Sequence, residues 1–128
     1  MHRKRVLVVD DHCEIRSLAL NVLAAQDYCI TEARSAAEAI AILSRDAAFD
    51  LIVADVVMPG ACNGVDLAKD VSRHWPDIPV VLMSGDPYGI KLAAREQRLS
   101  FLRKPFRSQE FALRVAETLA RRSDRPVA

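Results

Sequence analysis

The 128 residues are enough for one compact domain, and 51% of them are hydrophobic. Their 18 basic and 17 acidic side chains leave a formal charge of +1, which gives no general drive toward nucleic acid or an anionic membrane. Three cysteines without CxxC spacing argue against a disulfide framework. No apolar run is long enough for a transmembrane helix or a signal peptide, so we expect a cytoplasmic protein.

Five short apolar runs are separated by helical patterns. The runs are Val6–Val9, Cys29–Thr31, Leu51–Ala54, Val80–Met83 and Phe101–Leu102. Continuous runs rich in Val, Ile and Leu are typical of strands buried on both faces, as in a parallel sheet. Strand and helix alternating five times predict an α/β fold with a doubly wound, five-stranded parallel sheet and five helices.

The expected helices have one apolar side each. In the first, that side comprises Ile15, Leu18, Ala19, Val22 and Leu23. Ser35 and Glu38 are spaced as a capping box that opens the second. The fourth is expected around Tyr88 to Gln97, and Ser108 is expected to cap the fifth.

Polar residues stand where four of the apolar runs end. They are Asp10, Asp55, Ser84 and Lys104, and Asp11 follows Asp10 directly. Ligands of open α/β sheets bind outside the carboxyl ends of the strands, so we expect these side chains to converge on one edge. A single Asp or Ser there means little, because both residues are common in turns and caps. The joint pattern predicts a ligand-binding site at this edge of the sheet.

The charges of this pattern indicate its chemistry. Crowded carboxylates repel, so either one takes up a proton or a cation neutralises them, and Mg²⁺ (or Mn²⁺) suits oxygen ligands. Lys104 can pair with a carboxylate and later with a phosphate, and the Ser84 hydroxyl can donate to a phosphoryl oxygen. Since a carboxylate can form an aspartyl-phosphate, Asp55 at the middle run is the expected nucleophile.

Four motifs together resemble the receiver domain of bacterial two-component response regulators, of the stand-alone, chemotaxis type. They are Val8-Val9-Asp10-Asp11, Asp55-Val56-Val57-Met58-Pro59-Gly60, Met83-Ser84-Gly85 and Lys104-Pro105-Phe106. The resemblance covers essentially the whole chain. It implies a flavodoxin-like sheet of strand order 2-1-3-4-5, a receiver domain over residues 1–122 and a loose tail over residues 123–128.

The resemblance also implies a metal site and a phosphate donor. Metal ligands would be the side chains of Asp10, Asp11 and Asp55 and the backbone carbonyl of Val57. The phosphoryl group would come from a histidine kinase or a histidine phosphotransfer protein. Such a protein is a phosphoacceptor in signalling, which assists its own phosphorylation and dephosphorylation, and is otherwise no enzyme.

Four positions in the second half of the chain carry further implied roles. Lys104 and Ser84 would assist the transfer, and the Lys104–Pro105 peptide bond would be cis. Ser84 and Phe101 stand at the switch positions of the family. Phe101 lacks the hydroxyl of a tyrosine, so it would couple to Ser84 by packing alone.

The expected function is to switch the binding of a protein target or to relay phosphate. The alternative is a receiver-like interaction module that works without phosphorylation. A haloacid-dehalogenase-like phosphatase would need an Asp-x-Asp pattern, which Asp10-Asp11-His12 lacks. A flavodoxin-like FMN carrier would need a Ser/Thr/Gly-rich phosphate loop after the first run, where the acidic pair stands.

Two residues next to the acidic pair invite a metal interpretation. His12 and Cys13 are adjacent, however, and adjacent residues on one turn rarely bind one ion together. We therefore expect His12 to be a surface residue near the docking site of the donor. Cys29, in the second apolar run, is expected to be a small core residue.

Overall fold

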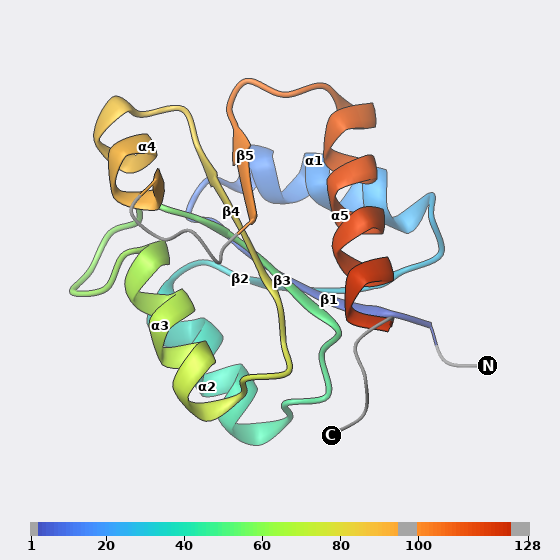
Figure 1. Ribbon diagram of the computed structural model, residues 1–128, viewed down its shortest axis with the longest axis horizontal. Coiled ribbons are helices and arrows are strands. Elements are labelled where there is room, and N and C mark those ends of the chain that lie inside the picture. Colours follow the sequence, from blue (N-terminus) through green and yellow to red (C-terminus); the bar gives the residue numbers. More distant parts are fainter. Residues whose placement is uncertain (1–2, 95–99, 124–128) are drawn as a thin grey trace.

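The computed structural model describes residues 3–94 and 100–123, in which strands and helices alternate along the chain (Figure 1). The strands are β1 (Arg5–Val9), β2 (Cys29–Ala33), β3 (Leu51–Asp55), β4 (Val80–Ser84) and β5 (Ser100–Arg103). The helices are α1 (Cys13–Ala24), α2 (Ala36–Arg45), α3 (Gly64–His74), α4 (Pro87–Ala94) and α5 (Ser108–Ser123). Each predicted apolar run forms a strand.

One sheet holds all five strands, in the order β2-β1-β3-β4-β5, and every neighbouring pair is parallel. The doubly wound, flavodoxin-like fold expected from the sequence is therefore confirmed. Because the strands are parallel, all five carboxyl ends lie at the same edge of the sheet. This edge is the place where the polar strand-end residues meet.

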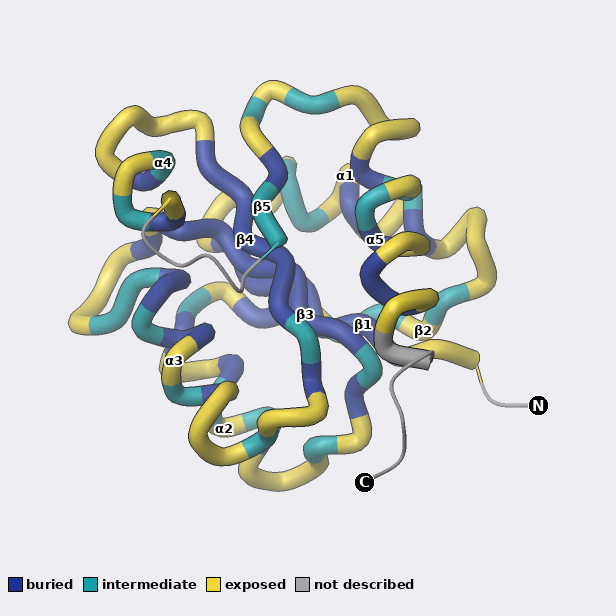
Figure 2. The backbone as a smooth tube through the Cα atoms, viewed as in Figure 1, coloured by how far each residue is buried: buried dark blue, intermediate teal, exposed yellow. Residues whose placement is uncertain are grey.

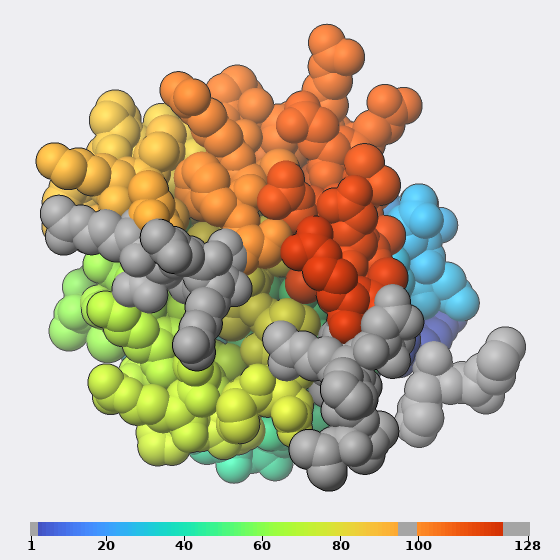
Figure 3. Space-filling model, in the orientation of Figure 1, coloured from blue at the N-terminus to red at the C-terminus, as the bar shows by residue number. Residues whose placement is uncertain are grey.

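Side chains alternate between the two faces of the sheet and build two hydrophobic clusters. Along β3, Ile52 and Ala54 pack with α2, α3 and α4, whereas Leu51 and Val53 pack with α1 and α5. Figure 2 shows the result, with buried strands at the centre and exposed residues on the outer sides of the helices. In Figure 3, α5 (red) covers the upper right of one molecular face and α3 (yellow-green) the lower left.

Hydrogen bonds at the helix starts differ in part from the sequence prediction. The Ser35 hydroxyl accepts a bond from the Glu38 backbone N–H at 3.1 Å, as expected of a cap. The full reciprocal box lies instead at Asn63 and Asp66, where each side chain accepts a backbone N–H of the other residue. The prediction for α5 was one residue off, because Ser108 is the first helical residue.

The prediction that Cys29 is a core residue is wrong, because its side chain is exposed. It is the first residue of β2, an edge strand that has only β1 as a neighbour. An edge strand has a neighbouring strand on one side only, so an apolar residue there can stay exposed and need not belong to the core.

Further expectations concern the second half of the chain and the possibility of membrane spans. The Lys104–Pro105 peptide bond is cis, as the resemblance implied. Helix α4 spans Pro87–Ala94, and the remainder of the range expected for it, like most of the expected tail, lies outside the described residues. Nowhere in residues 3–94 and 100–123 does a helix have both the length and the apolar character needed to cross a membrane.

Candidate functional site

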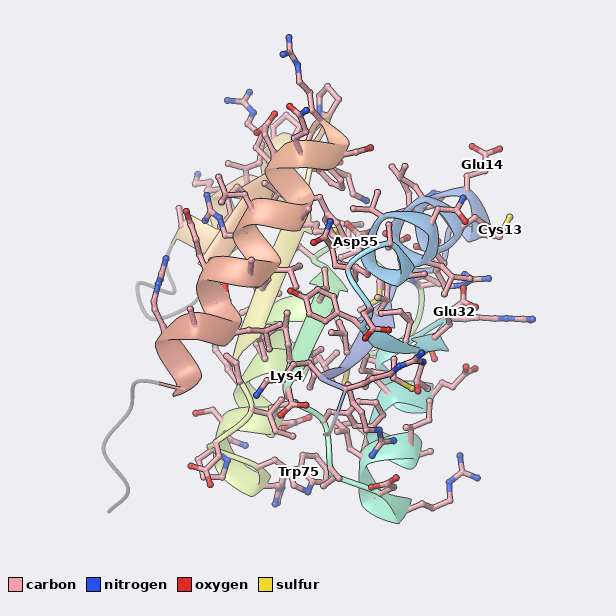
Figure 4. The ribbon with its side chains drawn as sticks, turned by 90° about the vertical axis from the view of Figure 1, so that its right-hand side faces the viewer. Lys4, Cys13, Glu14, Glu32, Asp55 and Trp75 are labelled. Carbon is pink, nitrogen blue, oxygen red and sulfur yellow. The ribbon has the colours of Figure 1, made fainter. Side chains whose placement is uncertain are left out.

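The predicted site residues meet at the carboxyl edge of the sheet. Asp10 directly follows β1, while Asp55 and Ser84 are the last residues of β3 and β4. Figure 4 shows Asp55 at the tip of the β3 arrow, with Trp75 at the opposite end of the molecule. All three side chains are buried, with 0%, 5% and 1% of the residue surface exposed, respectively.

Lys104 joins two of these carboxylates. Its Nζ lies 3.2 Å from Asp10 Oδ2 and 3.1 Å from Asp55 Oδ1, and its side chain is 19% exposed. A buried carboxylate without a partner would strongly destabilise the fold, and the one ammonium partners both acids. This contact joins residues that are 94 and 49 positions apart in the sequence.

The environment of Asp55 makes the ionised form of its carboxyl less favourable than it is in water. Burial raises the pKa of Asp55 above its ordinary value, because the ionised form loses its hydration. The Lys104 ammonium lowers this pKa, while the carboxylates of Asp10 and Asp11 raise it further. Burial is the largest of these effects, so the Lys104 ammonium does not fully offset the effect of burial on the pKa of Asp55.

The donor set fits a divalent cation. One ligand atom from each of Asp10, Asp11, His12 and Asp55 lies within 4.8 Å of the others. Carboxylate oxygens are the ligands that Mg²⁺ prefers, and it commonly takes one or two of them together with water and phosphate. When ionised, the three carboxylates exceed the Lys104 ammonium by two negative charges, which a divalent ion would balance.

His12 is a surface residue, as the sequence predicted, and its ring also lies against the carboxylates of this cluster. Its Nδ1 lies 3.1 Å from Asp10 Oδ1 and 3.4 Å from Asp11 Oδ1, and its backbone N–H donates to Asp10 Oδ1 at 2.9 Å. The neighbouring Cys13 points outward from the start of α1 (Figure 4). Of these two adjacent residues only His12 offers a ligand atom to the acidic cluster, which agrees with the expectation that the pair would not bind one ion together.

The Ser84 hydroxyl has a local partner. It accepts a hydrogen bond from the Asp86 backbone N–H at 3.3 Å and lies 3.4 Å from the Asp86 carbonyl oxygen, to which it can donate. The Ser84 carbonyl in turn accepts a bond from the Lys104 backbone N–H at 2.9 Å. The backbones of two predicted site residues are therefore joined directly.

The other two predicted positions lie in the loop after β3 and in β5. Val57 follows β3 by two residues, in the loop that leads to α3, and is 41% exposed. Phe101 pairs with Leu82 across the strands β5 and β4 and is partly buried against the cluster that includes α3 and α4. Phe101 is thus both a packing residue and a neighbour of the strand that carries Ser84.

Arg16 is a supporting residue that the sequence analysis missed. Its Nη1 donates to the backbone carbonyl of Asp10 at 2.8 Å, and its Nε lies 3.4 Å from Glu32 Oε1. The Arg16 side chain is only 11% exposed, so α1 and β2 together hold the backbone at the end of β1. Its place in the first turn of a helix that follows an acidic pair was the available signal.

Two glycines allow helices to approach the site closely. A Cβ on Gly64 would collide with the backbone carbonyl oxygen of Asp55 and lie 2.9 Å from Val56 Cα. A Cβ on Gly89 would collide with the Ser84 hydroxyl and lie 3.1 Å from Val57 Cγ2. Glycine is needed at both positions because the helices lie directly against the strand ends.

Comparison with known proteins agrees with this geometry. The family described as response regulator receiver domain matches residues 6–116. The response regulator SaeR of Staphylococcus aureus (strain USA300) is 31% identical over 122 residues, which make up 91% of this chain and 50% of SaeR. The chain thus spans about half the length of the curated relatives it matches.

Solved structures of receiver domains are also similar to this chain. The receiver domain from the hybrid histidine kinase CckA is 33% identical, with a TM-score of 0.76 over 90% of this chain and 98% of that one. A CheY-like response regulator receiver domain protein from Methanospirillum hungatei JF-1 shares the fold alone, at 20% identity and a TM-score of 0.85 over 95% and 98% of the two chains. With its fold, its acidic edge and the family match over most of its length, this chain belongs to the response regulator receiver domains of two-component signalling.

Proposed function

We propose that Asp55 accepts a phosphoryl group from a phosphohistidine on a histidine kinase or phosphotransfer protein. The observation that carries the proposal is the placement of Lys104, whose ammonium lies between the buried carboxylates of Asp10 and Asp55. Structural ion pairs also occur in protein interiors, but this one lies at the sheet edge where α/β folds bind ligands. Receiver domains are signalling partners of histidine kinases, which gives the donor its chemical class.

The transfer needs little covalent chemistry from the protein. A carboxylate oxygen of Asp55 attacks phosphorus, the bond from phosphorus to the donor nitrogen breaks, and the imidazole of the donor leaves. Lys104 lies within reach of Asp55 and opposes the negative charge that develops on the phosphoryl oxygens. A bound divalent cation supplies further positive charge, with Asp10, Asp11, Asp55 and the Val57 carbonyl as its proposed ligands.

Phosphorylation of Asp55 would change the hydrogen-bond partner of the Ser84 hydroxyl. Its hydroxyl can leave Asp86 and donate to a phosphoryl oxygen on Asp55, since the bonds to Asp86 measure 3.3 and 3.4 Å and are weak. Gly89 lies against Ser84, so a movement of this side chain would reach α4. Phe101, beside β4, is the proposed second part of the switch that changes the binding of a protein target or serves a phosphate relay.

The proposed place of action is the cytoplasm. All three cysteines are free, as in a reducing compartment.

Incubation of the protein with Mg²⁺ and acetyl phosphate, followed by intact-mass measurement, tests the proposal. The expected result is the mass of one added phosphoryl group, absent in Asp55→Asn and kept in Asp70→Asn. Asp70, on α3, is a matched control because it pairs only loosely with Arg73, at 3.9 Å. Persistence of the added mass in Asp55→Asn would show another acceptor.

The same measurement separates the alternative function. A chain that takes up no phosphoryl group under these conditions, nor from a panel of phosphorylated histidine kinases, would be an interaction module that works without phosphorylation. Phosphotransfer from one kinase in that panel at a much higher rate would instead identify the donor.

A further inference from the structure

The further inference concerns His12 and rests on the proposed function for the location of the cation. His12 immediately precedes α1, a position where a side chain often caps the helix. Within the described residues the His12 side chain makes no such cap hydrogen bond. Its ring is turned back toward the carboxylates, although the side chain is 64% exposed and has room to face solvent.

Lys104 and His12 approach different oxygens of the acidic cluster. Lys104 pairs with Asp10 Oδ2 and Asp55 Oδ1, whereas His12 Nδ1 faces Asp10 Oδ1 and Asp11 Oδ1. An ammonium can only donate hydrogen bonds, but a neutral imidazole nitrogen can bind a metal ion through its lone pair. His12 therefore offers the acidic site a ligand that Lys104 cannot supply.

The spacing is suitable for a shared ion. Oxygen and imidazole ligands lie about 2.0–2.2 Å from Mg²⁺ or a small transition-metal ion, so two ligands of one ion are separated by at most about 4.4 Å. The ligand atoms of Asp10, Asp11, His12 and Asp55 lie within 4.8 Å of one another. Small rotations of the exposed Asp11 and His12 side chains would therefore bring all four within reach of one ion.

We propose that His12 is a metal ligand that determines selectivity, so that the acidic site binds imidazole-preferring transition-metal ions more tightly than Mg²⁺. An all-oxygen site suits Mg²⁺, which binds nitrogen ligands poorly. Co²⁺ and Ni²⁺ accept imidazole readily and rank above Mn²⁺ in affinity for mixed nitrogen and oxygen sites. With His12 in place, the phosphoacceptor site would respond to which divalent ion is available.

The test compares Co²⁺ and Mg²⁺ binding by competition calorimetry on the unphosphorylated full chain, with no phosphate donor present. His12→Gln keeps a polar side chain of similar reach but removes the imidazole. We expect it to weaken Co²⁺ binding about 10- to 100-fold while Mg²⁺ binding changes less than about twofold. The visible absorption of bound Co²⁺ should also change, because its intensity and position follow the ligand set.

The chain offers two matched controls, since it has three histidines. His74→Gln makes the same change at the end of α3, and His2→Gln makes it near the amino terminus, where a histidine can bind transition metals independently. Neither should alter the ratio of Co²⁺ to Mg²⁺ affinity. Trp75 is unsuitable as a fluorescence probe, because it lies at the opposite end of the molecule from Asp55 (Figure 4).

Three results would overturn the inference. One is an equal change in the affinities for both ions. Another is tighter binding of both ions by His12→Gln, which would show that His12 competes with the metal as a partner of the carboxylates. The third is a sulfur-to-cobalt charge-transfer band that His12→Gln retains, which would assign the ligand to Cys13.

These outcomes are independent of phosphorylation. If the selectivity test succeeds and Asp55 takes up no phosphoryl group, the proposed function fails and the metal site stands. If Asp55 is phosphorylated with Mg²⁺ and the selectivity is unchanged in His12→Gln, only the inference on His12 fails.

Discussion

The Lys104 ammonium lies 3.1 Å from Asp55 Oδ1, although Asp55 ends β3 and Lys104 follows β5. The same ammonium reaches Asp10, so one cation serves two buried acids. This arrangement makes the stability of the fold and the chemistry of the site depend on the same charges, and it leads to the following predictions.

Replacing Lys104 by Met should destabilise the protein without Mg²⁺, because it leaves two buried carboxylates without a cation. The expected loss at neutral pH is up to about 3 kcal/mol of the free energy of unfolding, measured by urea denaturation in EDTA. Lys91→Met, on the exposed side of α4, should stay within about 0.5 kcal/mol of the wild type. An equal effect of both changes would mean that the contact of Lys104 with Asp55 contributes nothing.

Replacing Asp55 by Asn should stabilise the metal-free protein at neutral pH. Because the folded pKa of Asp55 is raised, its contribution to stability is fully present below the ordinary value of 3.8 and is lost as pH rises through the folded value. The advantage of the Asn variant should therefore shrink as the pH falls toward 3.8. Urea denaturation in EDTA over this pH range measures it, and a wild type that is more stable throughout would contradict the raised pKa.

Divalent cation should stabilise the folded chain by binding to the acidic cluster. At Mg²⁺ concentrations of a hundred times Kd, the gain is about 2.7 kcal/mol, visible as a rise in Tm. Asp11→Asn should lose most of this gain and Asp70→Asn should keep it. A Tm that rises equally in both variants would indicate a general salt effect.

Replacing Gly89 by Ala should disturb the contact between α4 and Ser84. The new Cβ would lie against the Ser84 hydroxyl and 3.2 Å from Ser84 Cβ, so either the hydroxyl rotates away from Asp86 or α4 moves. We expect a loss of about 1–3 kcal/mol, although alanine by itself favours a helix over glycine by about 1 kcal/mol. Tyr88→Ala, at a side chain that is 66% exposed, is the control and should be nearly neutral.

Replacing Gly64 by Ala should have a stronger effect, because the obstructing atoms are backbone. The added Cβ would meet the Asp55 carbonyl group, and the carbonyl cannot turn away without breaking β3. Urea denaturation should show a loss of about 3 kcal/mol and intact-mass measurement a slower uptake of phosphate. Arg73→Ala, exposed on the same helix, should change neither quantity.

The sequence predicted the sheet and the meeting of its strand-end residues for a simple reason. In a parallel sheet the carboxyl ends of all strands lie at one edge. Once the apolar runs were assigned to strands, Asp10, Asp55 and Ser84 were therefore expected at the same edge. The position of Lys104 followed from the same rule. These predictions needed only the order of the elements and no detail of side-chain conformation.

The rest depended on local geometry that a sequence does not carry. Whether His12 faces the carboxylates or solvent is set by the turn into α1 and by one side-chain rotamer. The need for glycine at position 64 is set by the distance between α3 and β3. Cys29 was assigned to the core from its apolar neighbours, whereas its exposure follows from the edge position of β2.

The backbone bond from Lys104 to Ser84 has a mechanical consequence. Because the Lys104 N–H donates to the Ser84 carbonyl at 2.9 Å, the ends of β4 and β5 move as one unit. A displacement of either side chain toward an anion would carry the other backbone with it. The loops that follow β4 and β5 would therefore move together. Substitutions of Ser84 and Lys104 should then be non-additive in any property that reports the movement of α4.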